Sequence, residues 1–102
     1  GPDAPPHSTR SVKVVEGQRI KFLLVDSPSK QLEKMSSTPH ERFLYVMSGT
    51  AVTEISGEKK TVCSGDLLHV PKGVTFSFLT RSTPTRYCYF ESTDFLETQI
   101  EE

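Results

Sequence analysis

The chain is divided into short runs of β-branched and aromatic residues, and each run is bounded by residues that favour turns. Groups such as Glu16-Gly17, Ser56-Gly57-Glu58 and Ser82-Thr83-Pro84 separate the runs. No segment sustains the apolar period of an amphipathic helix. The pattern predicts an all-β sandwich or barrel of about nine short strands, over residues 12–15, 20–25, 31–35, 43–47, 51–55, 61–63, 67–70, 74–79 and 86–90.

Length and charge restrict what such a chain does. A chain of 102 residues makes one domain with a modest core, which oligomerisation would help to stabilise. The net charge of -1 and the pI near 6.3 provide no basic field for phosphates, so direct nucleic-acid binding is disfavoured. The sequence holds no apolar run of about 18 residues and no signal-peptide pattern, so we expect no membrane span.

The two ends of the chain differ from its middle. Gly1-Pro2 is typical of the scar left when a protease removes a tag, so we expect a domain of a longer protein. Residues 1–10 contain three prolines and predict a flexible tail. Residues 11–93 are predicted to form the β-barrel, and residues 94–102 an acidic C-terminal segment.

The spacing of glycine and proline in the middle of the chain forms a motif. Gly49 closes an apolar run, and Gly65, Pro71 and Gly73 follow with the spacing G-x5-P-x-G. Such residues have backbone roles, because glycine supplies positive φ at tight turns and proline suits the end of a strand. The arrangement resembles the cupin family, and the resemblance implies a cupin-type jelly-roll barrel.

The positions where cupins carry their metal ligands hold other residues here. The resemblance places the ligand glutamate at Arg42, the last ligand histidine at Phe76, and the first two histidines within residues 35–38. None of these side chains is a good metal ligand. The resemblance therefore implies a cupin with no cofactor, whose degenerate pocket is formed by Arg42, His69, Phe76 and Phe78.

We predict no catalytic residue in this pocket, because Val74, Phe76 and Phe78 point together and fill the lumen. No Ser-His-Asp or Cys-His arrangement has a recognisable local context, so an enzyme is not expected. One alternative retains a metal, bound by two imidazoles and a carboxylate. Its ligands would be His40, His69 and Glu41, whereas Cys63 and Cys88 match no zinc motif and are expected to be reduced thiols.

Several strands are apolar on both faces. In residues 42–48, Phe43, Tyr45 and Met47 alternate with Leu44 and Val46, and a single core covers only one of these sets. A second apolar face predicts an interface with another subunit or a partner. The alternative is that these side chains lie half exposed, as is common. The residues predicted for the interface are Phe43, Tyr45, Met47, Tyr87 and Tyr89.

Within the cupins, segments 43–49 and 64–73 resemble the C-terminal dimerisation domain of centromere protein C, a metal-free cupin. The resemblance implies a homodimer that serves as an interaction scaffold. It also implies location in the nucleus, at the centromere and kinetochore, and partners among other centromere or chaperone proteins.

Two other functions remain open. A small-molecule cupin, a sugar sensor or an isomerase, would line its lumen with His40, His69, Arg42 and Tyr45. A nucleic-acid module would use Lys13, Arg19, Lys21 and Lys34, and its DNA binding would depend steeply on salt.

Overall fold

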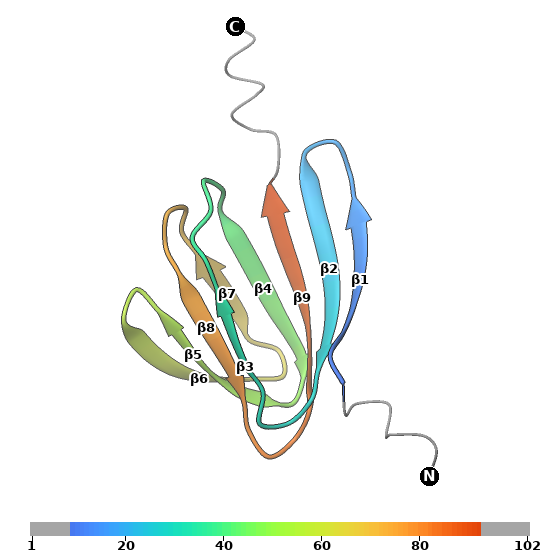
Figure 1. Cartoon of the computed structure of the whole chain (residues 1–102), viewed down its shortest axis with the longest axis vertical. Helices are drawn as coiled ribbons and strands as arrows, with labels where there is room; N and C mark the ends of the chain where they lie inside the picture. Colours follow the sequence, from blue (N-terminus) through green and yellow to red (C-terminus); the bar gives the residue numbers. More distant parts are fainter. Residues whose placement is uncertain (1–8, 93–102) are drawn as a thin grey trace, which may run out of the picture.

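A computed structural model of the chain describes residues 9–92 and contains nine strands there (Figure 1). The strands are β1 (Ser11–Glu16), β2 (Ile20–Ser27), β3 (Leu32–Met35), β4 (Arg42–Ser48), β5 (Thr50–Ile55), β6 (Glu58–Cys63), β7 (Leu67–Val70), β8 (Phe76–Thr80) and β9 (Thr85–Ser92). The predicted all-β class and the number of strands are confirmed. Among these residues there is no helix long and apolar enough to cross a membrane.

The strands form two antiparallel sheets that face each other (Figure 1). The five-stranded sheet has the order β1-β2-β9-β4-β7, and the four-stranded sheet has the order β3-β8-β5-β6. Strands next to each other in sequence repeatedly lie in different sheets, as a jelly roll requires. The predicted tail and acidic segment fall largely outside the described residues, although Arg10 lies within them.

Strand β6 is longer than the sequence pattern predicts. It begins at Glu58, because the turn from β5 consists only of Ser56 and Gly57, with φ of 53° and 79°. Two consecutive residues with positive φ match the right-handed twist of a tight hairpin. Lys59 and Lys60 therefore lie in the ladder, opposite Glu54 and Thr53, and not in a loop.

The register of β4 and β9 shows which face of the five-stranded sheet is buried. Leu44 is opposite Tyr89, and Val46 is opposite Tyr87. These side chains face the other sheet and are buried. With them the core between the sheets consists of Val25, Leu44, Val46, Ala51, Val62, Leu68, Val70, Phe76, Phe78, Tyr87 and Tyr89.

Gly49 allows the chain to pass directly from β4 in one sheet to β5 in the other. Its φ is 89°, and a Cβ atom there would lie 2.8 Å from the Cα atom of Thr85. Only glycine fits such a close approach of two backbones at positive φ. Pro71 follows the last residue of β7, where its missing N–H leaves no ladder bond unmade.

A polar cluster joins the two sheets along the side where β2 and β3 lie. Glu33 on β3 is buried and accepts hydrogen bonds from Arg10 Nε at 2.9 Å, Ser27 Oγ at 2.6 Å and the hydroxyl of Tyr87. Burial, together with the charge of Glu33, raises the pKa of Tyr87 far above its ordinary value. Ser27 and Tyr87 belong to the five-stranded sheet and Arg10 directly precedes it, so the buried carboxylate has three donors and links the two sheets on this side.

Candidate functional site

The outward face of the five-stranded sheet carries exposed apolar side chains that the core does not explain. Phe43, Tyr45 and Met47 project from β4 and are 46%, 40% and 40% exposed. Phe43 is opposite Phe90 of β9, and Tyr45 is opposite Cys88. The residues of β2, β1 and β7 that pair with these positions point to the same side of the sheet. We call this surface the outer apolar face; it consists of Val15, Ile20, Phe22, Leu24, Phe43, Tyr45, Met47, Leu67, Cys88 and Phe90.

Side chains of the outer apolar face pack against one another. The rings of Phe22 and Phe90 meet edge to face, with centroids 4.7 Å apart. The Sγ atom of Cys88 lies 3.5 Å from the Sδ atom of Met47. Contiguous packing of this kind makes a single patch and not a set of isolated exposed residues.

Charged groups border this patch. The Nε atom of Arg86 lies 2.7 Å from a carboxylate oxygen of Asp26. His69 stacks on the ring of Phe43 at 4.9 Å and forms a hydrogen bond of 2.7 Å with Glu41. An apolar centre with a polar rim is the usual composition of a protein interface.

Two residues predicted for this surface lie on the other face of the sheet. Tyr87 and Tyr89 are 0% and 7% exposed and point into the core. The prediction was wrong because it assigned the tyrosines of β9 to the face of Phe43, whereas they are opposite Val46 and Leu44. The outward residues of β9 are Cys88 and Phe90, which strand alternation identifies only once the register with β4 is known.

Between the sheets, Arg42 fills the place where the family pattern puts a metal ligand. It is 1% exposed, and its Nη1 atom donates to the carbonyl of Ser36 at 2.9 Å. The guanidinium also donates to the carbonyl of Val74 and lies 5.1 Å from the ring centroid of Phe76. Two degenerate ligand positions, Arg42 and Phe76, thus pack against each other as a cation–π pair.

The residues of this pocket do not fit a metal. A guanidinium stays protonated and has no lone pair to offer, and a phenyl ring is not a ligand. Phe78 packs on Tyr87 at 4.5 Å and fills the adjoining volume. Within residues 9–92 no group of three His, Cys, Asp or Glu side chains is placed to hold a metal ion.

His69 was predicted to belong to the pocket and does not. It is opposite Phe43 in the β4–β7 ladder, so it faces outward with the apolar patch. Tyr45 also faces outward, which separates both residues from Arg42. The residues proposed for a small-molecule lumen are therefore not brought together.

The polar groups that do face inward near Arg42 are Tyr89 and Glu91. The hydroxyl of Tyr89 donates to Glu91 at 2.8 Å. Burial raises the pKa of Tyr89 to about 12, and the hydrogen bond to Glu91 adds to the shift. Both effects keep this phenol protonated.

The cations proposed for nucleic-acid binding lie on different surfaces. Lys13 points outward from β1, as Val15 does, whereas Lys21 is opposite Glu91 and points to the other side of the sheet. Lys34 is on the opposite sheet. These residues do not form one basic patch.

Comparisons with known proteins match this geometry to one family. The model of the Cupin domain matches residues 22–90. No curated protein matches the sequence. Solved structures share the fold, among them the Schizosaccharomyces pombe Cnp3 cupin domain, with a TM-score of 0.79 and 16% identity over 90% of this chain and 70% of that one.

Two further solved structures with this fold are of bacterial proteins. The EutQ protein of Clostridium difficile has a TM-score of 0.69 and 20% identity, over 84% of this chain and 69% of that one. KdgF from Halomonas sp. has a TM-score of 0.75 and 18% identity, over 88% of this chain and 82% of that one. At these identities the likeness establishes the fold alone.

Proposed function

Because the chain belongs to the cupin family, we propose that it is a non-catalytic cupin that pairs with a second copy of itself through the outer apolar face. The observation that carries this proposal is the exposure of contiguous aromatic and aliphatic side chains on the five-stranded sheet. Such a patch exceeds what isolated surface residues account for.

A second copy suits this surface because the patch is broad and mostly uncharged. It crosses all strands of one sheet, and its charged pairs lie at the border. A stable homodimer buries on the order of 800 Å² per subunit, with aromatic residues as the usual hot spots. Two such faces related by a two-fold axis would bury each other.

The absence of catalysis is supported by the chemistry of the pocket. Arg42 and Phe76 occupy ligand positions, and Phe78 fills the lumen beside them. The fold does not decide this point, because the DMSP lyase DddQ of Ruegeria pomeroyi shares it. Small-molecule binding remains the alternative that the experiment must be able to favour.

The dimer is proposed to act as a scaffold at the centromere and kinetochore, in the nucleus, with other centromere or chaperone proteins as partners. The cupin domain of Cnp3 supports this assignment by its similar fold. The motif spanning Gly49 and residues 64–73 supports it from the sequence.

The experiment is light scattering on a sizing column across a wide concentration range, with the original chain and two variants. The original chain should have twice the mass of 11.4 kDa. Tyr45→Glu should remain folded by circular dichroism and dissociate at least about 30-fold more readily, the effect of losing a hot spot. Leu79→Glu is the matched control, because Leu79 is 38% exposed on the opposite sheet.

A monomer at every concentration would overturn the proposal. A dimer that Leu79→Glu disrupts and Tyr45→Glu leaves intact would also overturn it, since the contact would then lie on the other sheet. A melting shift with small sugars or divalent metals would favour the small-molecule cupin.

A further inference from the structure

The outward face of the four-stranded sheet carries a second, smaller apolar area. Leu32 on β3 is directly opposite Leu79 on β8, and Leu79 is opposite Val52 on β5. Leu32 is 49% exposed and Leu79 is 38% exposed. We call these three side chains the apolar row; it crosses three strands at right angles to their direction.

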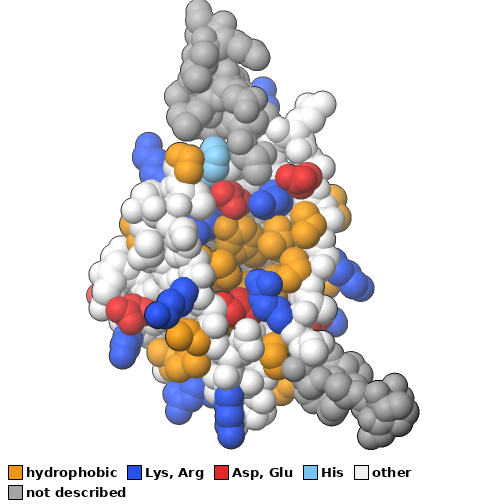
Figure 2. Space-filling model, viewed as in Figure 1, with side chains coloured by type: hydrophobic (Ala, Val, Ile, Leu, Met, Phe, Trp, Pro, Cys, Tyr) orange, Lys and Arg blue, Asp and Glu red, His pale blue; other side chains and the backbone are white. Residues whose placement is uncertain are grey.

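Cationic side chains flank the apolar row on both sides. The next row of the ladder is Lys34, Ser77, Glu54 and Lys59. On the other side lie Lys30 and Arg81, which are exposed and linked by a backbone hydrogen bond of 2.9 Å. In Figure 2, on the side where β8 and β5 lie, hydrophobic side chains at the lower left have Lys and Arg side chains around them.

This surface is positively charged in a chain that is not. Four cations and one carboxylate, Glu54, surround the apolar row, whereas the whole chain carries a net charge of -1. The difference makes the surface an electropositive site. A second copy of the same surface would bring cations against cations, which disfavours self-association here.

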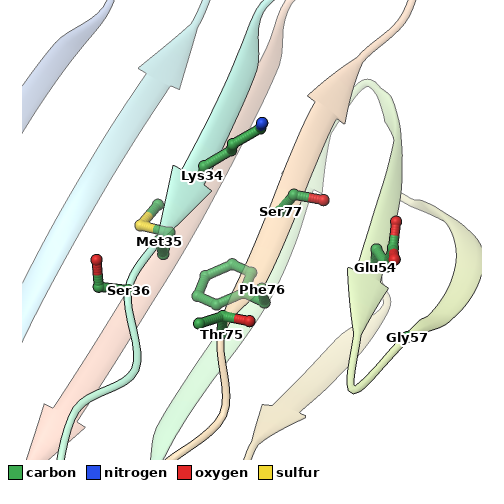
Figure 3. A pocket seen from close by; sticks show the side chains of 8 residues that line it. All are labelled: Lys34, Met35, Ser36, Glu54, Gly57, Thr75, Phe76 and Ser77. Atoms are coloured by element: carbon green, nitrogen blue, oxygen red, sulfur yellow. The ribbon is translucent and has the colours of Figure 1, made fainter.

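The surface is also hollowed. One depression of about 240 Å³ contains Leu32, Val52 and Leu79, and a second of about 440 Å³ continues beside it. Both depressions are lined by Lys34, Glu54 and Ser77, so they form one groove. In Figure 3 these three side chains project from β3, β5 and β8, with Met35 and Phe76 deeper in the second depression.

We propose that this groove binds an acidic, amphipathic peptide segment of a partner protein. Its apolar side chains would pack on the apolar row, and its carboxylates would pair with Lys34 and Lys59. Strands about 4.8 Å apart make the row roughly 10 Å long, which matches two turns of a helix. Nucleic acid is the poorer fit, because exposed leucines offer nothing to a phosphate backbone.

This inference goes beyond the proposed dimer and does not depend on it. The outer apolar face belongs to the five-stranded sheet and the groove to the four-stranded sheet, so a dimer would leave the groove open. One domain would then join two copies through one sheet and recruit a partner through the other.

The probes are short synthetic peptides of Glu and Leu, one with Leu in helical spacing and one with strict alternation, and a matched peptide with Lys in place of Glu. Binding to the full chain is followed by amide chemical shifts in solution. An acidic peptide should shift Leu32, Lys34, Val52 and Leu79, and the Lys peptide should not. The combined Lys34→Glu and Lys59→Glu variant should weaken binding at least about tenfold, as expected for two charge reversals.

Two controls separate this surface from the dimer. Lys72→Glu, in the turn after β7, makes the same charge change as either single reversal and should leave peptide affinity within about twofold, because Lys72 lines neither depression and an exposed charge is screened. Tyr45→Glu should bind the peptide as well as the original chain does, even if the dimer is lost. Failure of the groove and failure of the dimer are thus distinguishable.

Three outcomes would overturn the proposal. The first is no shift with either acidic peptide. The second is equal or tighter binding of a DNA duplex at the same residues, which would make the groove a nucleic-acid site. The third is a shift of the Leu32 and Leu79 amides in the peptide-free chain when Glu97 and Glu101 are replaced by Lys, together with no peptide binding in either form, which would make the chain's own acidic end the occupant of the groove.

Discussion

Strands β4 and β9 have two apolar faces of similar composition, and the two faces differ in what surrounds them. On the inner face, Leu44 and Tyr89 meet the opposite sheet and are buried. On the outer face, the neighbouring Phe43 and Tyr45 are nearly half exposed. The inner face also contains buried polar groups that pair within the chain, such as Tyr87 with Glu33 and Tyr89 with Glu91, although Arg42 Nε has no partner among the described residues; the charged pair of the outer face lies at its border.

The difference shows that hydrophobicity alone does not identify a core. Both faces would favour burial by about 25 cal/mol per Å² of apolar surface. Only the inner face is covered by another part of the chain. The outer face therefore requires a second molecule to be buried, and the two faces should respond to mutation in opposite ways.

The largest effect is expected for a charge on the inner face. Leu44→Asp should cost about 5 kcal/mol or more, because it removes a packed side chain and buries a carboxylate without a partner. A domain of this size has about 5–15 kcal/mol of stability, so the variant should be unfolded or nearly so. Phe43→Asp, one residue away, should stay folded in thermal melts followed by circular dichroism, and its mass by light scattering should be that of a monomer. The reverse result would exchange the roles of the two faces.

A smaller effect is expected in the polar cluster that joins the sheets. Glu33→Ala should lower the free energy of unfolding by about 2–3 kcal/mol, because Arg10, Ser27 and Tyr87 lose their common acceptor. Urea unfolding monitored by fluorescence or circular dichroism measures this loss. The control is Glu54→Ala on the outward face of the same sheet, which should change stability by no more than about 0.5 kcal/mol. Equal losses in both variants would show that the cluster contributes nothing specific.

The two thiols report on the outer face without a change in sequence. Cys63 is exposed near the end of β6, whereas Cys88 lies within the outer apolar face. In a dimer, Cys88 should react with a thiol reagent at least about tenfold more slowly than Cys63, because its access is blocked. In Tyr45→Glu the Cys88 rate should rise while that of Cys63 stays constant. Unchanged rates in that variant would argue that no second molecule covers Cys88.

The smallest effect concerns pH and the inner face. The pKa of Tyr89 is raised to about 12, so the folded state holds this proton more tightly than the unfolded chain does. Stability from this residue is complete below the ordinary tyrosine pKa of about 10 and is lost as pH rises towards 12. Unfolding free energies measured from pH 9 upward should fall less steeply in Tyr89→Phe, each value being referred to the same variant at neutral pH. If the free energy of unfolding falls equally steeply with pH in both proteins, the loss of stability at alkaline pH comes from other residues.

Much of the fold could be predicted because its signals are local. Glycine at positive φ in the β5–β6 turn and proline after β7 act within a few residues, so the number and order of the strands follow from the pattern, although β6 begins earlier than predicted. The residues at the metal-ligand positions could be identified for the same reason, since Arg42 and Phe76 stand at fixed numbers of residues from Gly49 and Gly73.

The errors arose where the answer depends on pairing between distant strands. A strand presents alternate residues to opposite sides, but alternation does not say which side meets the rest of the protein. For this reason the prediction from the sequence assigned three residues to the wrong face of the sheet: Tyr87, Tyr89 and His69. The apolar row was missed because Leu32, Val52 and Leu79 come from three separate strands and become neighbours only in the sheet.

The sequence by itself determined the class of fold, most of its turns and the residue types at the metal-ligand positions of the cupin pattern, because each of these depends on backbone preferences and residue types close together in the chain. The tertiary structure decided which of two apolar faces is the core and which lies open, and it assembled the groove on the opposite sheet. The physical reason is that burial is a property of what covers a side chain, and in this protein the covering strands come from distant parts of the sequence.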